Sequence, residues 1–170
     1  MTSTSTHQHR QSAPDHVGVC VLTVSDTRTL DTDRGGDRIE SLMLAAGHRI
    51  RGRRIVPDEC AMIANTAREL LAIEGVDALL VTGGTGLAAR DQTTEAVESL
   101  YDAVIPGYGE LFRMLSFQEI GPAAMLSRAS AGRFGRQVIL TMPGSPAGVQ
   151  LAMERLIVPE LTHLVFQERG

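Results

Sequence analysis

Three short runs of almost uninterrupted apolar residues constrain the fold of this chain more than any other feature. They cover residues 17–24, 76–82 and 137–142. Strands that are buried on both faces have continuous apolar runs, whereas strands with one face in water alternate apolar and polar residues. Because helical patterns separate the three runs, the strands are expected to pair in parallel through right-handed crossovers. The sequence therefore predicts an α/β fold with a parallel sheet.

The remaining elements follow from apolar periodicity and from the positions of glycine and proline. Residues 48–56 form a more polar strand, which is expected nearer the edge of the sheet. Pro159 should kink or split the last helix, because proline removes a hydrogen bond and clashes with the preceding turn. Apolar residues at helical spacing predict helices over residues 37–46, 59–74, 94–101, 109–117, 122–131 and 146–166.

The length of 170 residues corresponds to a single domain, which we expect to cover residues 16–168. Residues 1–15 are polar and contain no apolar run, so they are predicted to be a disordered tail and not a signal peptide. His7 and His9 could bind a metal as an H-x-H pair, but a solvated tail is the simpler interpretation. No apolar segment has the length that crosses a bilayer.

The charges and the cysteines restrict the classes of function. The chain has 16 basic and 20 acidic residues, which argues against nucleic-acid binding, because nucleic-acid-binding proteins usually carry a basic excess. Every basic residue is Arg, so no lysine is present to form a Schiff base or to clamp a phosphate as in a P-loop. Cys20 and Cys60 do not form a CxxC pair, and we expect a reducing, cytoplasmic location.

Polar loops follow the apolar runs where the strands are predicted to end. The carboxyl ends of parallel strands meet at one edge of an open α/β sheet, and ligands bind outside that edge. The residues predicted to bind substrate or nucleotide are Ser25 and Asp26 in the first loop, Thr82, Gly83, Gly84, Thr85 and Gly86 in the second, and Pro143, Gly144, Ser145 and Pro146 in the third. The first pair could equally cap a turn, and the last four could form only a strand-to-helix turn.

The TGGTG sequence at residues 82–86 is suited to holding an anion. Its glycines permit positive φ angles and close approach of a ligand, and successive N–H groups can form a concave anion site. The sequence matches neither GxGxxG nor GxxxxGK[ST], so it is not a standard dinucleotide or Walker site. A tight turn is the alternative, but three glycines with two threonines favour a ligand loop.

Asp58 and Asp91 are the candidate catalytic residues near these loops. Asp58 could be an ordinary helix N-cap, and Asp91 could be a solvated carboxylate, although Thr93 is better placed to cap the next helix. Carboxylates beside a phosphate-binding loop are also the usual protein ligands of Mg²⁺, so we predict that the two aspartates bind this ion. Arg90 and Arg128 could contact an anion or could lie on the surface.

Residues 107–117 contain three of the six aromatic residues of the chain. Phe112 and Phe117 are predicted to pack in the core. Glu110, Arg113 and Ser116 are better candidates to face a ligand or a subunit interface.

Several short motifs follow one another along the chain. They are SDTRT at residues 25–29, GGD at 35–37, VPD at 56–58, TGGTGLAARD at 82–91, PGYGELFRMLSFQEIGPAAMLSRA at 106–129 and PGSP at 143–146. Their order resembles that of the MogA/MoaB family of molybdenum cofactor biosynthesis. The resemblance extends over residues 17–164, and the segment that begins GELFRMLS favours the MoaB branch.

This resemblance implies a three-layer α/β/α molybdopterin-binding fold, with helices on both faces of the sheet, that assembles as a homotrimer or homohexamer. It implies an enzyme, a nucleotidyltransferase that adenylylates molybdopterin with Mg-ATP and releases pyrophosphate. The two functional aspartates of the family fall on Asp58 and Asp91, which would position Mg²⁺ and the attacking phosphate. Residues 82–86 would cradle phosphate or adenylate. A non-catalytic protein that binds molybdopterin and passes it to other proteins of the pathway is the alternative.

Overall fold

A mixed sheet of six strands forms the centre of the molecule. The computed structural model describes residues 16–169, and the strand order in its sheet is β2-β1-β3-β6-β5-β4. Four strands run parallel, namely β1 (Gly18–Val24), β2 (Arg49–Val56), β3 (Ala78–Thr82) and β6 (Gln137–Met142). The short strands β4 (Ala103–Val104) and β5 (Ala131–Phe134) pair antiparallel. The mostly parallel sheet and the edge position of residues 48–56 are confirmed.

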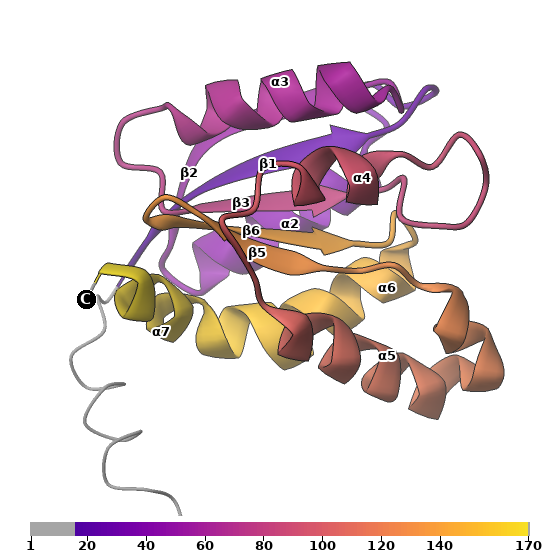
Figure 1. The fold of residues 1–170 in the computed structure, drawn as a ribbon. Coiled ribbons are helices and arrows are strands. Elements are labelled where there is room, and N and C mark those ends of the chain that lie inside the picture. Colours follow the sequence, from indigo (N-terminus) through magenta and orange to yellow (C-terminus); the bar gives the residue numbers. More distant parts are fainter. Residues whose placement is uncertain (1–15, 170) are drawn as a thin grey trace, which may run out of the picture.

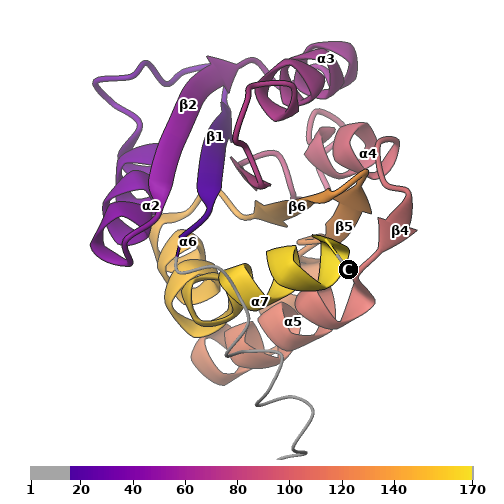
Figure 2. The same cartoon turned by 90° about the vertical axis from the view of Figure 1, so that its left-hand side faces the viewer.

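Helices cover both faces of this sheet, as Figures 1 and 2 show. One face is covered by α3 (Cys60–Leu71) and α4 (Thr93–Glu98). The other is covered by α2 (Arg34–Ala45), α5 (Pro106–Ile120), α6 (Pro146–Ala152) and α7 (Val158–Arg169). The expected three-layer architecture is therefore confirmed.

The central strand β1 explains why its sequence is apolar at every position. Val19 and Val21 pack into the core under α2, α5 and α7, whereas Cys20 and Leu22 pack into the core under α3. All four side chains are fully buried. A strand with both faces covered has no position for a polar side chain in water.

The expected break at Pro159 takes the form of a π-helical turn. Residues Met153–Ile157 form this turn between α6 and α7, and Pro159 follows at the start of α7. A wider turn accommodates the proline ring, which would otherwise clash with a carbonyl of the preceding turn.

The predicted helix over residues 122–131 is wrong. Gly121, with φ of +64°, ends α5, and only the 3-10 turn Gly121–Leu126 follows. The chain then enters β5, which forms a hairpin with β6 through Gly135 at φ of +60°. Gly132 is required in β5, because a methyl group there would lie 2.2 Å from the ring of Tyr101. A short strand that depends on its partner for pairing leaves little local signal.

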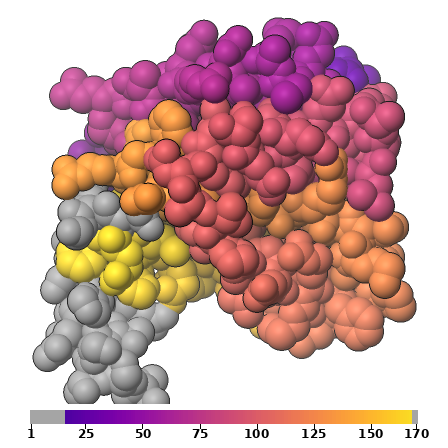
Figure 3. All heavy atoms as spheres, in the orientation of Figure 1, coloured from indigo at the N-terminus to yellow at the C-terminus, as the bar shows by residue number. Residues whose placement is uncertain are grey.

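Helix α5 is apolar on two sides, and one of them is exposed. Phe112 is buried against the sheet as predicted, whereas Phe117 is 59% exposed, so its predicted core position is wrong. Residues 106–126 form the lower right of the surface in Figure 3. We call the large exposed apolar side chains of this segment the α5 apolar surface; they are Leu111, Met114, Phe117, Ile120, Met125 and Leu126.

The predicted disordered tail and the H-x-H pair of His7 and His9 lie outside the described residues. Within residues 16–169, no helix is long and apolar enough to cross a membrane.

Candidate functional site

The loops that follow β1, β2, β3 and β6 meet at the carboxyl edge of the parallel strands. Residues 127–130 reach the same edge, because β5 runs antiparallel and its first residue, Ala131, pairs with Leu140 near the end of β6. Asp26 ties three of these loops together: its Oδ1 accepts a 3.0 Å hydrogen bond from the N–H of Asp58, and its Oδ2 pairs with Arg90. The predicted convergence of the loops is thus found in the structure.

The glycines of residues 82–86 allow the loop to pass close to its neighbours. Gly83 has φ of +97°, and a methyl group on it would lie 2.2 Å from the carbonyl oxygen of Val24. Its N–H donates to the carbonyl of Met142 at 3.1 Å, and Thr82 Oγ1 donates to the carbonyl of Pro143 at 3.1 Å. The loop is therefore held between the ends of β1 and β6.

The next three backbone N–H groups of the loop are not used in hydrogen bonds within the described residues. No oxygen of residues 16–169 accepts a hydrogen bond from the N–H of Gly84, Thr85 or Gly86. Gly84 has φ of +62°, a conformation that favours glycine. Free N–H groups that follow one another in such a turn form a concave donor site for an anion.

Asp58 is not a cap of its own helix. The N-cap residue of α3 is Glu59, and Asp58 Oδ1 instead accepts a 2.9 Å hydrogen bond from the N–H of Gln92. The Gln92 side chain in turn accepts from the N–H of Cys60 at 3.0 Å. Gln92, and not the expected Thr93, is the N-cap residue of α4. The starts of α3 and α4 are thus locked together, which fixes Asp58 beside the loop.

Asp58 and Asp91 both lie against glycines of the loop. A methyl group on Gly84 would lie 2.5 Å from Asp58 Oδ2, and one on Gly86 would lie 2.5 Å from Asp91 Oδ2. Asp91 Oδ2 also accepts a 3.0 Å hydrogen bond from the N–H of Ala88. The absence of side chains at the two glycines therefore makes room for the two carboxylates.

The electrostatic environment of Asp58 disfavours its ionised form. Burial raises its pKa, and the negative charges of Asp91 and Asp26 raise it further. The hydrogen bond from the N–H of Gln92 and the charge of Arg90 oppose this shift without cancelling it. A bound cation would relieve the repulsion among the three carboxylates.

The donor set fits Mg²⁺ held jointly by protein and substrate. Within the described part of the chain, no cluster of three or more His, Cys, Asp or Glu side chains could hold a metal ion alone. Mg²⁺ usually binds through one or two carboxylates, substrate phosphates and retained waters. Asp58 and Asp91 supply that number of carboxylates, and both lie against glycines of the same loop.

The remaining loop residues divide between structural and site positions. Ser25 Oγ accepts hydrogen bonds from the N–H groups of Thr27 and Arg28 at 3.3 Å each, so it caps its own turn. Ser145 is the N-cap of α6, where its Oγ accepts from the N–H of Gly148 at 3.1 Å, and Pro146 is the first helical residue. Residues 143–146 therefore form a strand-to-helix turn.

The same turn also borders the TGGTG loop. A methyl group on Gly144 would lie 3.2 Å from the Cα of Gly83. A pocket of about 160 Å³ opens beside the turn and is lined by Pro143, Ser145 and Ser116 among others. Ser116 thus lies beside residues 143–146.

Arg128 organises the loop that carries Asp91, a role that the sequence left open. Its Nε donates to the carbonyl of Gly86 at 2.7 Å, and its Nη2 donates to the carbonyl of Asp91 at 2.6 Å. Its Nη1 pairs with Glu95, and its backbone N–H donates to the carbonyl of Thr85 at 3.2 Å. The guanidinium therefore fixes both ends of residues 86–91.

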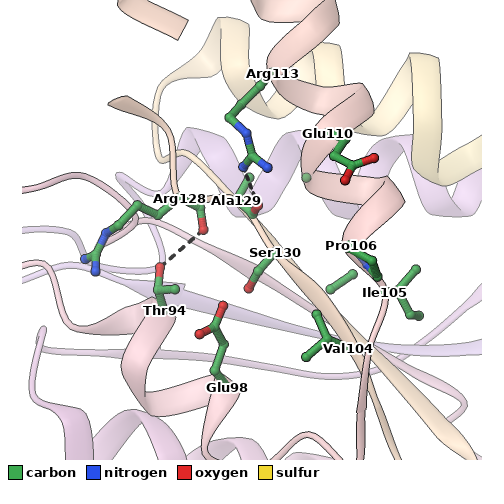
Figure 4. A pocket seen from close by; sticks show the side chains of 12 residues that line it. Thr94, Glu98, Val104, Ile105, Pro106, Glu110, Arg113, Arg128, Ala129 and Ser130 are labelled. Atoms are coloured by element: carbon green, nitrogen blue, oxygen red, sulfur yellow. Dashed lines mark hydrogen bonds between the residues drawn. The ribbon is translucent and has the colours of Figure 1, made fainter. Parts of the chain in front are cut away.

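Two larger pockets flank Arg128. One, of about 440 Å³, is lined by Asp91, Gln92 and residues 87–89. The other, of about 360 Å³, lies between α4, β4, β5 and α5, and Figure 4 shows Glu110 and Arg113 of α5 at its edge. Glu110 is therefore brought to a neighbouring pocket and not to the TGGTG loop.

Substituting Arg128 with alanine is expected to loosen the loop. Two backbone carbonyls would lose charged donors, and such hydrogen bonds contribute about 1.5–3 kcal/mol each. Amide hydrogen exchange measured by mass spectrometry should accelerate in residues 86–91 and stay unchanged in β1. The exposed Arg34→Ala on α2 serves as the control and should leave both segments unchanged. Unchanged exchange in residues 86–91 of Arg128→Ala would contradict the role assigned to this side chain.

Comparison with known proteins gives consistent similarities over nearly the whole chain. Residues 20–163 match the family model described as "Probable molybdopterin binding domain". The chain is 49% identical over 162 residues to molybdenum cofactor biosynthesis protein B of Halalkalibacterium halodurans, covering 95% of each protein. A crystal structure of a molybdenum cofactor biosynthesis protein B aligns with a TM-score of 0.90 and 46% identity, over 93% of this chain and 99% of that one. The tungsten cofactor synthesizing protein MoaB of Pyrococcus furiosus aligns with a TM-score of 0.83 and 31% identity, over 93% and 100%.

Proposed function

The chain belongs to the MogA/MoaB family of molybdopterin-binding domain proteins, and from this membership we propose that it adenylylates molybdopterin in molybdenum cofactor biosynthesis. The observation that carries the proposal is a glycine loop with three unpartnered backbone N–H groups next to two carboxylates. The free N–H groups of residues 84–86 lie beside Asp58 and Asp91, which pack against the glycines of the same loop.

In the proposed reaction, an oxygen of the molybdopterin phosphate attacks the α-phosphorus of ATP. A new P–O–P bond joins the pterin phosphate to AMP, and the bond between the α-phosphorus and the bridging oxygen to the β-phosphate breaks. Pyrophosphate leaves with the electron pair of that bond. Such a transfer requires alignment of the two phosphates and stabilisation of their charges more than covalent chemistry by the protein.

The residues of the site have distinct roles in this reaction. The N–H groups of Gly84, Thr85 and Gly86 would bind phosphate oxygens and stabilise the charge that develops on them. Asp58 and Asp91 would hold Mg²⁺, which supplies charge neutralisation between the substrate phosphates. Asp26 and Arg128 would hold the loops in place, because Asp26 accepts a hydrogen bond from the N–H of Asp58 and Arg128 donates one to the carbonyl of Asp91.

The direct test is identification of the product. Purified protein would be incubated with Mg-ATP and molybdopterin, and the products would be separated and weighed by mass spectrometry. The proposal predicts a species with the mass of molybdopterin plus an adenylyl group, and its formation should require Mg²⁺. Binding of molybdopterin without formation of this species would leave the carrier function and overturn the proposed activity.

We also propose that the protein forms a homotrimer or homohexamer through the α5 apolar surface. Six large apolar side chains are exposed along residues 111–126, and Met125 is 74% exposed. An α-helix that is apolar on two sides is expected to be covered on both. Contiguous apolar patches of this kind mark interaction sites on soluble proteins.

Substituting Phe117 and Ile120 together with serine is expected to dissociate the assembly. Phe117 is 59% exposed and Ile120 is 60% exposed, so their loss removes a large part of the apolar area that would be buried. Light scattering coupled to size-exclusion chromatography should show a lower mass for the double variant. The control is Leu44→Ser, which removes an exposed leucine on α2 and should leave the mass unchanged. A wild-type protein that is monomeric would contradict this proposal.

A further inference from the structure

Thr93 carries a buried hydroxyl group for which the fold provides no partner. The residue is fully buried at the start of α4, and its Oγ1 forms no hydrogen bond with any residue of the described part of the chain. Its backbone is well bonded, since its N–H donates to the carbonyl of Gly84 at 3.1 Å. A buried hydroxyl without a partner destabilises the folded state, because it has lost its hydrogen bonds to water.

The hydroxyl faces the candidate site and not the core. A methyl group built on Gly84 would lie 2.3 Å from Thr93 Oγ1 and 2.5 Å from Asp58 Oδ2. The two oxygens therefore point into the same space beside Gly84. The other carboxylate oxygen, Asp58 Oδ1, is already held by the N–H of Gln92 at 2.9 Å. A hydrogen bond from Thr93 to Oδ2 would fix the second half of the same carboxylate.

We propose that Thr93 is a positioning residue whose hydroxyl, unpaired in this structure, donates to Asp58 Oδ2 when the cation and the phosphates bind, and so orients that carboxylate toward them. This inference rests on the proposed function of the site. The hydroxyl would leave one lone pair of Oδ2 for the cation, while Gln92 and Thr93 hold the carboxylate from two sides. A polar group that hydrogen-bonds to a metal-binding carboxylate orients it, and the loss of such a group weakens metal binding.

A purely structural role would require a different environment. Thr141 shows what that environment is: it is fully buried in β6, and its Oγ1 accepts from the N–H of Ser130 at 2.8 Å and donates to the carbonyl of Ser130 at 3.1 Å. Thr93 has no such bonds and does not cap α4. Valine would fill the same volume in α4 and would avoid the unpaired hydroxyl.

The test compares Thr93→Val, Thr93→Ser and the control Thr141→Val. Thermal denaturation of Thr93→Val should give a midpoint equal to or higher than that of wild type, whereas Thr141→Val should give a lower one. Binding of Mn²⁺, used alone as a paramagnetic probe and followed by electron paramagnetic resonance, should be about tenfold weaker in Thr93→Val, the size expected for a lost hydrogen bond to a charged group. Thr93→Ser, which keeps the hydroxyl, should restore most of this affinity.

Three outcomes would overturn the inference, and they are distinguishable. If wild type binds Mn²⁺ and Thr93→Val binds it equally well, Thr93 does not position Asp58 and the proposed function is unaffected. If wild type neither binds Mn²⁺ nor forms the adenylylated product, the proposed function fails and this inference fails with it. Weaker binding in Thr93→Val with a lowered midpoint would also count against it, because the hydroxyl would then stabilise the fold itself.

Discussion

Replacing Asp58 with asparagine is expected to lower adenylyl transfer about a hundredfold or more, the loss typical of removing one charge-stabilising group from an active site. The unfolding midpoint should nevertheless stay the same or rise. Asparagine retains an oxygen that can accept the hydrogen bond from the N–H of Gln92. It also removes a negative charge that burial and the neighbouring Asp91 and Asp26 disfavour.

The sign of this stability effect follows from the direction of the pKa shift. The pKa of Asp58 is raised in the folded protein, so its ionisation at neutral pH destabilises the folded state relative to the unfolded one. Loss of activity with unchanged or increased stability is the usual signature of a residue kept for function.

The matched control for this variant is Glu59→Gln. It changes the adjacent, exposed carboxylate, which makes no capping hydrogen bond. It should alter neither the rate of adenylyl transfer nor the unfolding midpoint. Rates would be measured by product formation and stability by differential scanning calorimetry. Full activity in Asp58→Asn would remove this residue from the proposed site.

Replacing Asp33 with asparagine should be the most damaging of the single changes for stability, at about 3 kcal/mol, because it breaks a buried ion pair. Asp33 is 1% exposed and ends the loop that follows β1. Its carboxylate accepts hydrogen bonds from Thr23 Oγ1 at 2.6 Å, from the N–H of Gly36 at 3.0 Å and from Arg53 Nη2 at 2.8 Å. The network joins β1, β2 and α2.

The control for this variant is Asp37→Asn. Asp37 pairs with the same guanidinium, but its side chain is 57% exposed, so its loss should cost less than about 1 kcal/mol. Urea denaturation at neutral pH would measure both changes. Equal losses in the two variants would show that the burial of Asp33 adds nothing.

The contribution of Asp33 should also depend on pH. Burial acts to raise its pKa, but the hydrogen bonds from Thr23, Gly36 and Arg53 outweigh burial and lower it below the ordinary value of 3.8. A carboxylate whose pKa is lowered by folding stabilises the folded state at every pH above its pKa in the unfolded chain. This stabilisation is lost as the pH falls through its pKa in the folded protein. The stability difference between wild type and Asp33→Asn should therefore be constant near neutral pH and shrink below about pH 4.

The sequence allowed the central sheet to be predicted because its strands are buried on both faces. In β1 and β6 the apolar runs coincide with the strands, and the loops after them converge as expected. The strand β5 could not be predicted in this way, because it has four residues, contains Gly132 and is defined by pairing with β6. The exposed position of Phe117 was missed for another reason: an apolar side chain in a helix does not reveal which of two apolar sides faces the sheet.

The loops of the candidate site could be predicted from the sequence, but the hydrogen bonds that join them could not. TGGTG and the two aspartates are visible as local patterns of residue type and spacing. The hydrogen bonds from Arg128 to the carbonyls of residues 86 and 91 and from the N–H of Cys60 to Gln92 join segments more than thirty residues apart, so no local pattern could indicate them. The unpaired hydroxyl of Thr93 is a property of three-dimensional packing alone.

Pyrophosphate release by the purified protein, with Mg-ATP and molybdopterin, is the measurement that tests the proposed activity most directly. It should be made beside Asp91→Asn, whose side chain keeps an oxygen able to accept the hydrogen bond from Ala88 but carries no charge. The account predicts release that requires molybdopterin and that falls about a hundredfold or more in the variant. Release that is absent from wild type while molybdopterin still binds, or that is equal in the two proteins, would contradict it.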